Sequence, residues 1–125
     1  MDQTNVYGSS LQLCSSSPMT GWFRDGYARY DRTDTGQHTL CAKMTEDFLN
    51  YTRSMGNDLT RPSPPMFPGL KAGDCWALCA ARWLEAYKAG FAPQVKLEAT
   101  HEKALDIVPL NILEKFNAVT GQQNE

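Results

Sequence analysis

Several polar side chains stand in predicted loops or at the ends of predicted elements, where they could converge into one pocket. They are Arg24, His38, Asn57, Asp58, Arg82, Glu98 and His101. Binding and catalytic groups gather at such positions because a rigid scaffold can hold loops together. His38 and His101 could support acid–base chemistry if they approached each other and a carboxylate. The same side chains could instead form a structural network of ion pairs and hydrogen bonds, because such networks also perturb pKa values without catalysis.

Among the charged residues, Arg82 is the one most clearly expected to need an acidic partner. It lies in a stretch that is otherwise largely apolar, so we expect its guanidinium to be buried. A buried charge without a partner is costly. Asp58 or Glu98 is therefore expected to pair with it.

The chain has four cysteines, and two of them are candidate reactive thiols. Cys75 and Cys79 fall near a predicted helix start, with Arg82 one turn beyond Cys79, and both features stabilise a thiolate. Burial beside Trp76 and Trp83 would raise the thiol pKa instead. In a reducing compartment all four cysteines are expected to remain free thiols or to pack as small hydrophobes.

Metal and cofactor sites are not predicted. The residue types that bind zinc are present, but no C-x-x-C pair brings them together; they are Cys14, His38, Cys41, Cys75, Cys79 and His101. The sequence also lacks a glycine-rich phosphate loop, H-E-x-x-H and G-x-S-x-G, so no cofactor is expected.

A helix over about residues 75–89 is expected to organise the fold. Asp74 is a suitable N-cap, and Gly90 can adopt the left-handed conformation that ends a helix. Apolar residues occupy nearly all sides of this stretch, which is typical of a helix covered on more than one side. We therefore predict that it is buried at the centre of the molecule.

The other predicted elements alternate irregularly along the chain. Asp25-Gly26 between aromatic runs indicates a hairpin, and strands are expected near Leu40 and near Leu97. Thr45 is expected to cap a helix that ends at Gly56, and further helices are expected over 101–107 and 110–118. This mixture predicts an α+β fold with a small, mainly antiparallel sheet packed around the central helix.

Length and composition suit one domain over residues 1–125. Residues 57–72 are rich in proline and are expected to form a long loop, either functional or a simple crossover. Residues 120–125 are polar and are expected to fray.

Charge and hydropathy exclude several classes of partner. The net charge is −2 with no basic block, which argues against binding to nucleic acid or to an anionic membrane. There is no apolar run of membrane-spanning length and no signal-peptide pattern. We therefore expect a soluble, cytoplasmic protein; the sequence does not address its oligomeric state.

Several blocks together resemble a known family. They are Asn5-Val6-x-Gly8, Cys14-Ser15, Pro18-Met19-Thr20-Gly21-x-x-Arg24-Asp25-Gly26, Gly36-x-His38-Thr39-x-Cys41-Ala42-x-Met44-Thr45, Gly56-Asn57-Asp58-Leu59, Phe67-Pro68-Gly69-Leu70-Lys71-x-Gly73-Asp74, Cys79-Ala80-x-Arg82-Trp83-x-Glu85-Ala86 and Leu97-Glu98-Ala99-Thr100-His101-Glu102. This pattern is similar to domain of unknown function 2237, a family of small, mainly bacterial proteins. The resemblance implies one intact domain and no particular activity.

Departures from the family pattern restrict the thiol chemistry. Family members often have cysteine where this chain has Tyr27, Ala28 and Ala77, and arginine where it has Cys75. Cys14, Cys41 and Cys79 match. A thiol function shared with the family would therefore use those three.

The leading functional hypothesis is a small-ligand pocket, possibly catalytic, between the 57–72 loop, Arg24, His38 and Arg82. One alternative is a non-catalytic interaction domain with inert cysteines, marked by an apolar patch around Trp22 or Met66. A second alternative is a thiol-based redox or metal site. Whether the protein is an enzyme stays open at this point.

Overall fold

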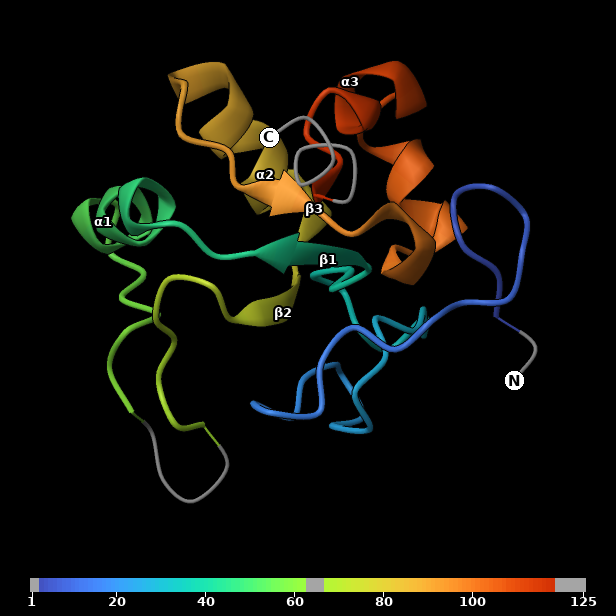
Figure 1. The fold of residues 1–125 in the computed structure, drawn as a ribbon, viewed down its shortest axis with the longest axis horizontal. Coiled ribbons are helices and arrows are strands. Elements are labelled where there is room, and N and C mark those ends of the chain that lie inside the picture. Colours follow the sequence, from blue (N-terminus) through green and yellow to red (C-terminus); the bar gives the residue numbers. More distant parts are fainter. Residues whose placement is uncertain (1–2, 63–66, 119–125) are drawn as a thin grey trace.

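The computed structural model of the chain describes residues 3–62 and 67–118. A three-stranded antiparallel sheet lies at its centre, in the order β2-β1-β3 (Figure 1). β1 (Leu40–Lys43) lies between β2 (Cys75–Leu78) and β3 (Gln94–Val95). Its first three residues are buried, which suits a central strand covered on both faces.

Three α-helices and two short 3-10 helices surround the sheet. They are α1 (Glu46–Ser54), α2 (Ala80–Ala89), α3 (Leu110–Glu114) and the 3-10 helices Leu97–Ala99 and Glu102–Asp106. In Figure 1, α2 and α3 lie on one side of the strands, and the lighter-blue loops that follow the first loop of the chain lie on the other. The fold class predicted from the sequence, α+β with a small antiparallel sheet, is confirmed.

The helix after β1 forms as local signals predict. The Thr45 hydroxyl accepts a hydrogen bond of 3.1 Å from the N–H of Phe48, and two acidic residues occupy the first turn. These features satisfy a free donor and favour the helix dipole. Phe48, Leu49 and Thr52 form the buried face of α1. Gly56 has a positive φ of 90°, as expected just past a helix end.

The prediction of one helix over about residues 75–89 is wrong in its first part. Residues 75–78 form β2, because their backbone groups pair with β1 in a register that places Leu40 opposite Leu78. The helix begins only at Ala80, with Cys79 as its N-cap, and it ends at Gly90 as predicted. Asp74 caps a turn instead, where its carboxylate accepts from the N–H of Lys71 at 3.0 Å.

α2 is buried on one face, through Ala80, Trp83 and Ala86. Its remaining positions are half-buried or exposed, so it is a surface helix that anchors a core residue. Trp83 is fully buried, and Tyr87 and Phe116 pack against its ring. The core around this residue includes side chains from all three strands.

The predicted hairpin at Asp25-Gly26 is also wrong. Among the described residues, 20–30 form turns and no strand. The N–H of Gly26 donates to the carbonyl of Thr20 at 2.8 Å, which closes the segment into a turn, and the carbonyl of Gly26 accepts from the N–H of Cys14 at 2.8 Å. The strand expected near Leu97 is short: β3 ends at Val95, and Leu97 begins a 3-10 helix.

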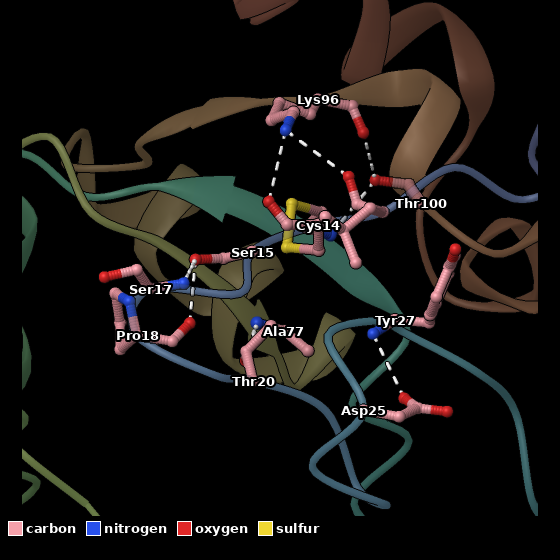
Figure 2. The surroundings of a disulfide bond; sticks show 12 residues. Cys14, Ser15, Ser17, Pro18, Thr20, Asp25, Tyr27, Ala77, Lys96 and Thr100 are labelled. Atoms are coloured by element: carbon pink, nitrogen blue, oxygen red, sulfur yellow. Dashed lines mark hydrogen bonds between the residues drawn. A yellow bond between two sulfur atoms is a disulfide. The ribbon is translucent and has the colours of Figure 1, made fainter.

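Cys14 and Cys41 form a disulfide, which corrects the expectation that all four cysteines are free (Figure 2). Their Cα atoms are 5.7 Å apart, and both side chains are buried. The bond joins the N-terminal loop to β1 across a sequence separation of 27. Lys96 strengthens this junction, because its ammonium donates to the carbonyl of Cys14 at 3.1 Å. Cys75 is free and packs against the disulfide from β2.

Two expectations about chain organisation stay predictions. These are the single domain over residues 1–125 and the functional loop over 57–72, in which residues 63–66 lie outside the described part. The tail 120–125 also lies outside it. Within the described residues, no helix has both the length and the hydropathy to span a bilayer.

Candidate functional site

Two adjoining hollows meet at the end of the β1–β2 ladder. One has a volume of about 330 Å³ and the other about 150 Å³. His38, Trp76 and Ala77 line both. The larger hollow adds Asn57, Leu59, Leu78, Cys79 and Arg82, and the smaller adds Gly21, Trp22 and Arg24. We call the pair the His38 groove.

The register of the sheet explains why these residues meet. Leu40 lies opposite Leu78, so the chain just before β1 and the chain just after β2 leave the ladder at the same end. The N–H of Ala80 continues the contact by donating to the carbonyl of Gln37 at 3.3 Å. His38 and Cys79, which are distant in the sequence, therefore lie at the same end of the sheet.

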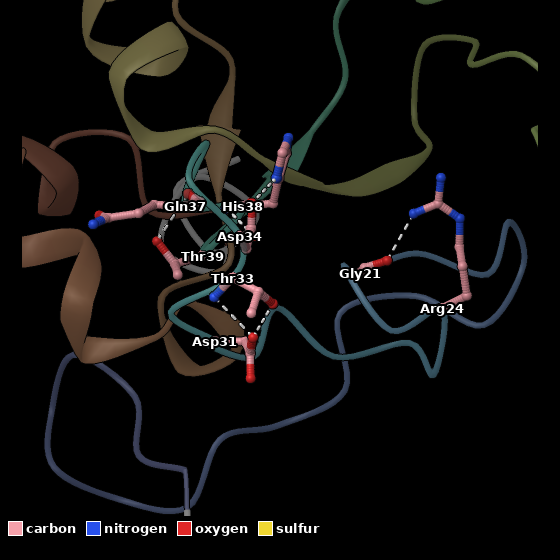
Figure 3. Close-up of polar contacts among 8 residues, drawn as sticks. All are labelled: Gly21, Arg24, Asp31, Thr33, Asp34, Gln37, His38 and Thr39. Atoms are coloured by element: carbon pink, nitrogen blue, oxygen red, sulfur yellow. Dashed lines mark hydrogen bonds and ion pairs between the residues drawn. The ribbon is translucent and has the colours of Figure 1, made fainter.

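His38 is oriented by a buried carboxylate (Figure 3). Its Nδ1 lies 2.8 Å from Oδ1 of Asp34, and its backbone N–H donates to Oδ2 of Asp34 at 2.9 Å. The Asp34 side chain is only 1% exposed, whereas that of His38 is 38% exposed. A carboxylate on Nδ1 fixes the ring and leaves Nε2 for other partners. Asp34 is not among the site residues predicted from the sequence.

The backbone around His38 is adapted to this arrangement. A Cβ on Gly36 would lie 2.8 Å from Cε1 of His38, so only glycine leaves the ring this space. Gln37 has a φ of +49° and Arg24 a φ of +55°; they are the two described non-glycine residues with positive φ. Left-handed backbone at such residues costs about 1 kcal/mol or more and tends to concentrate at functional sites. Both residues adjoin or line the His38 groove.

Arg24 borders the smaller hollow and is held by two contacts. Its Nη1 donates to the carbonyl of Gly21 at 2.7 Å, and its guanidinium lies 5.1 Å from the ring centroid of Trp76. The loop that carries it is fastened to β2, because the N–H of Ala77 donates to the Thr20 hydroxyl at 2.7 Å. In Figure 3 the Arg24 guanidinium and the His38 ring extend to the same side of their loops.

Arg82 is not buried, which corrects the sequence-based expectation. Its side chain is 51% exposed and its Nη1 lies 3.5 Å from Oε1 of Glu85 on the same helix. Neither Asp58 nor Glu98 is its partner. An exposed pair of this kind contributes at most about 1 kcal/mol, so the guanidinium is readily available to a ligand.

A model of the family described as "uncharacterized protein conserved in bacteria (DUF2237)" matches residues 4–117. The chain belongs to the DUF2237 family. The resemblance predicted from the sequence motifs is thereby confirmed. A comparison with curated proteins finds no match. The description of the DUF2237 family names no activity.

The structure brings together some of the predicted site residues of this DUF2237 protein and separates others. Arg24, His38, Asn57, Arg82 and Cys79 line the His38 groove. Asp58 does not: its Oδ1 accepts from the N–H of Thr60 at 3.0 Å and from its hydroxyl at 2.6 Å. These bonds hold the pKa of the Asp58 carboxyl below its usual value.

Glu98 and His101 lie away from the groove. Glu98 lines a separate hollow of about 360 Å³ together with Tyr7 and Lys96. His101 is buried and caps the second 3-10 helix, where its Nδ1 accepts from the N–H of Lys103 at 3.0 Å. His38 and His101 therefore do not form the pair that acid–base chemistry between them would need.

The buried imidazole of His101 predicts that the folded protein loses stability at acidic pH. Burial lowers the pKa of His101, with Lys103 lowering it further and Glu102 opposing. The unfolded chain therefore binds the proton more readily, and the free energy of unfolding falls as pH drops below about 6.5. Protonation would also place a hydrogen on Nδ1 against the N–H of Lys103. Urea titrations between pH 7.5 and 5 should show this decline.

His101→Asn is the matched variant for that titration. Asparagine can accept the same capping bond but does not titrate. The decline between pH 7 and 5 should become shallower in this variant. An unchanged slope would assign the acid sensitivity to other groups.

Cys75 differs from Cys79 in its surroundings. Burial raises the pKa of the Cys75 thiol, and the nearby Lys96 and Lys43 only partly oppose it. Cys79 is free and half-buried in the groove. Among the described residues no group of three His, Cys, Asp or Glu side chains is placed to hold a metal ion. The disulfide also removes Cys14 and Cys41 from the candidate zinc ligands.

Proposed function

We propose that the His38 groove binds a small ligand that carries a carboxylate. The observation that supports this most is the charge of its lining. Arg24 lines the smaller hollow and Arg82 the larger, and no acidic side chain is among the described residues that line either hollow. Two cationic groups on a concave surface attract an anion and orient it.

The apolar lining complements the charge. Trp76 and Leu59 provide an apolar wall, and the Trp22 ring stacks in parallel with His38 at 6.2 Å between centroids. Asn57 adds an amide that can donate or accept. Since small-molecule sites combine an apolar lining with a few polar anchors, this groove suits an acid with a flat or short apolar body.

The proposal is tested by thermal denaturation with paired compounds. Benzoate and succinate should raise the melting temperature, while benzamide and succinamide should not, because only the acids offer a charge to the arginines. A ligand at tenfold its dissociation constant stabilises by about 1.4 kcal/mol, which is about 4 °C for a domain of this size. Isothermal titration calorimetry would give the affinities.

Variants locate the binding. Arg24→Gln and Arg82→Gln should each weaken benzoate binding about tenfold. Lys88→Gln is the matched control, because it removes a cation from the same helix as Arg82 but outside the groove lining. If acids and amides shift the melting temperature equally, or if Lys88→Gln weakens binding as much as Arg82→Gln, the proposed carboxylate site is wrong.

A protein-interaction domain is the second candidate. Leu13, Met19, Trp22 and Phe23 are between 42% and 45% exposed, and a Cβ on Gly26 would touch both Leu13 and Met19. Clustered exposed apolar side chains can mark a docking surface. Met66, which the sequence also suggested, lies outside the described residues. If neither benzoate nor succinate raises the melting temperature, this alternative is favoured. A cytoplasmic location and the absence of a nucleic-acid partner stay predictions.

A further inference from the structure

The larger hollow of the His38 groove is lined by both a free cysteine and a histidine. Cys79 and His38 line the same hollow, and the N–H of Ala80 reaches the carbonyl of Gln37 beside them. His38 in turn has Asp34 on its Nδ1. A nucleophile, a base and a group that orients the base are the recurring arrangement for covalent catalysis by cysteine or serine.

The start of α2 supplies a further element. Cys79 is the N-cap of this ten-residue helix, and its side chain makes no capping bond. The first helical bond runs from the N–H of Trp83 to the carbonyl of Cys79 at 3.0 Å. The N–H groups of Ala81 and Arg82 therefore have no partner inside the helix. Such donors favour negative charge on a thiolate or on a carbonyl oxygen under attack.

We propose that Cys79 is a nucleophile that accepts an acyl group from a small activated ester or thioester, with His38 as its base and Asp34 as the residue that positions His38. This inference rests on the proposed function, because the bound acid is the product that such a reaction releases. The apolar wall of the groove would hold the acyl compound within reach of the thiol, and Arg24 and Arg82 would hold the carboxylate that the second step forms.

The reaction has two steps. In the first, the Cys79 thiol gives its proton to Nε2 of His38, its sulfur forms a bond to the acyl carbon, and the bond from that carbon to the alcohol or thiol breaks. The leaving group takes the proton from His38. In the second step, water gives a proton to His38 and its oxygen bonds to the acyl carbon. The carbon–sulfur bond then breaks, and Cys79 regains the proton from His38.

The test uses p-nitrophenyl acetate with the intact protein. Release of p-nitrophenolate should show a burst, and peptide mass spectrometry should place the acetyl group on Cys79 and not on Cys75. Cys75 is an internal control, because it is the other free thiol and its burial disfavours the thiolate. Cys79→Ser should abolish the burst, and Cys75→Ser should leave it unchanged.

Variants of the His38–Asp34 pair test the assigned roles. His38→Gln should slow acetylation at least about a hundredfold, since a general base contributes about 10² to 10⁴. Asp34→Asn should lower the maximal rate of acetylation while the affinity for benzoate is retained, which a general loss of structure would not do. Near-ultraviolet circular dichroism confirms that each variant is folded.

The outcomes separate the two proposals. If benzoate binds but Cys79 acetylates no faster than free cysteine, the nucleophile is excluded and the ligand site stands. If Cys79 reacts rapidly and depends on His38 but benzoate does not bind, the carboxylate site is wrong and the thiol remains. Should His38→Gln not fold, the wild-type comparison of Cys79 with Cys75 decides: equal acetylation of the two overturns the inference.

Discussion

Replacing Cys14 and Cys41 together with alanine is expected to lower the free energy of unfolding by about 3 to 4 kcal/mol. The disulfide closes a loop with a sequence separation of 27, and losing such a link returns conformational entropy to the unfolded chain. The melting temperature should fall by about 10 °C or more. Thermal and urea denaturation of the wild type and the double variant would measure the change.

A reductant provides the matched control for that comparison. Dithiothreitol should lower the melting temperature of the wild type toward that of the double variant and should leave the double variant unchanged. Cys75→Ser should still respond to the reductant as the wild type does, because Cys75 is not part of the disulfide. A wild type that is insensitive to dithiothreitol would show that the bond does not stabilise the fold.

The sequence predicts elements well where their signals are local. Thr45, the acidic first turn and Gly56 fix both ends of α1 without help from the rest of the chain. Residues 75–78 are different, because Trp76, Ala77 and Leu78 suit a helix as well as a strand. Pairing with β1, more than thirty residues earlier in the chain, decides for the strand. Such long-range pairing is not visible in one sequence.

The candidate site could be predicted only in part, because long-range pairing decides which of its residues meet. Arg24, His38 and Arg82 stand at element ends, and element ends meet in the groove. Asp34 gives only a weak signal, its spacing of four residues from His38. A carboxylate in a polar loop resembles many solvated ones until the loop folds over His38. The disulfide is missed because the expected reducing compartment would keep all four cysteines as free thiols.

His101 and Glu98 show the opposite error. Both have the right chemistry and stand at element ends, yet the 3-10 helices after β3 carry them away from the groove. His101 serves as a helix cap, which agrees with the alternative that the candidate polar side chains have structural roles. Position at an element end therefore selects candidates, and only the sheet register decides which of them meet.

Trp83→Ala is expected to be the most damaging single substitution outside the disulfide. Trp83 is fully buried, stacks on Tyr87 with ring centroids 5.7 Å apart, and meets Phe116 edge-on at 5.2 Å. Its Nε1 also donates to the carbonyl of Pro93 at 3.0 Å. Truncation leaves a large cavity and an unpaired carbonyl, which together cost about 3 to 5 kcal/mol. Urea denaturation followed by circular dichroism would measure the loss.

Two further variants show whether the loss of stability in Trp83→Ala comes from lost packing. Trp83→Phe keeps an aromatic ring but not the indole N–H, so it should cost clearly less than Trp83→Ala. Trp22→Ala removes the same side chain from a site that is 45% exposed, and it should cost under about 1 kcal/mol. α2 carries Trp83 into the core and Cys79 at its start, so a loosened α2 should also slow acetylation of Cys79. If Trp22→Ala and Trp83→Ala destabilise equally, Trp83 does not anchor α2 in the core.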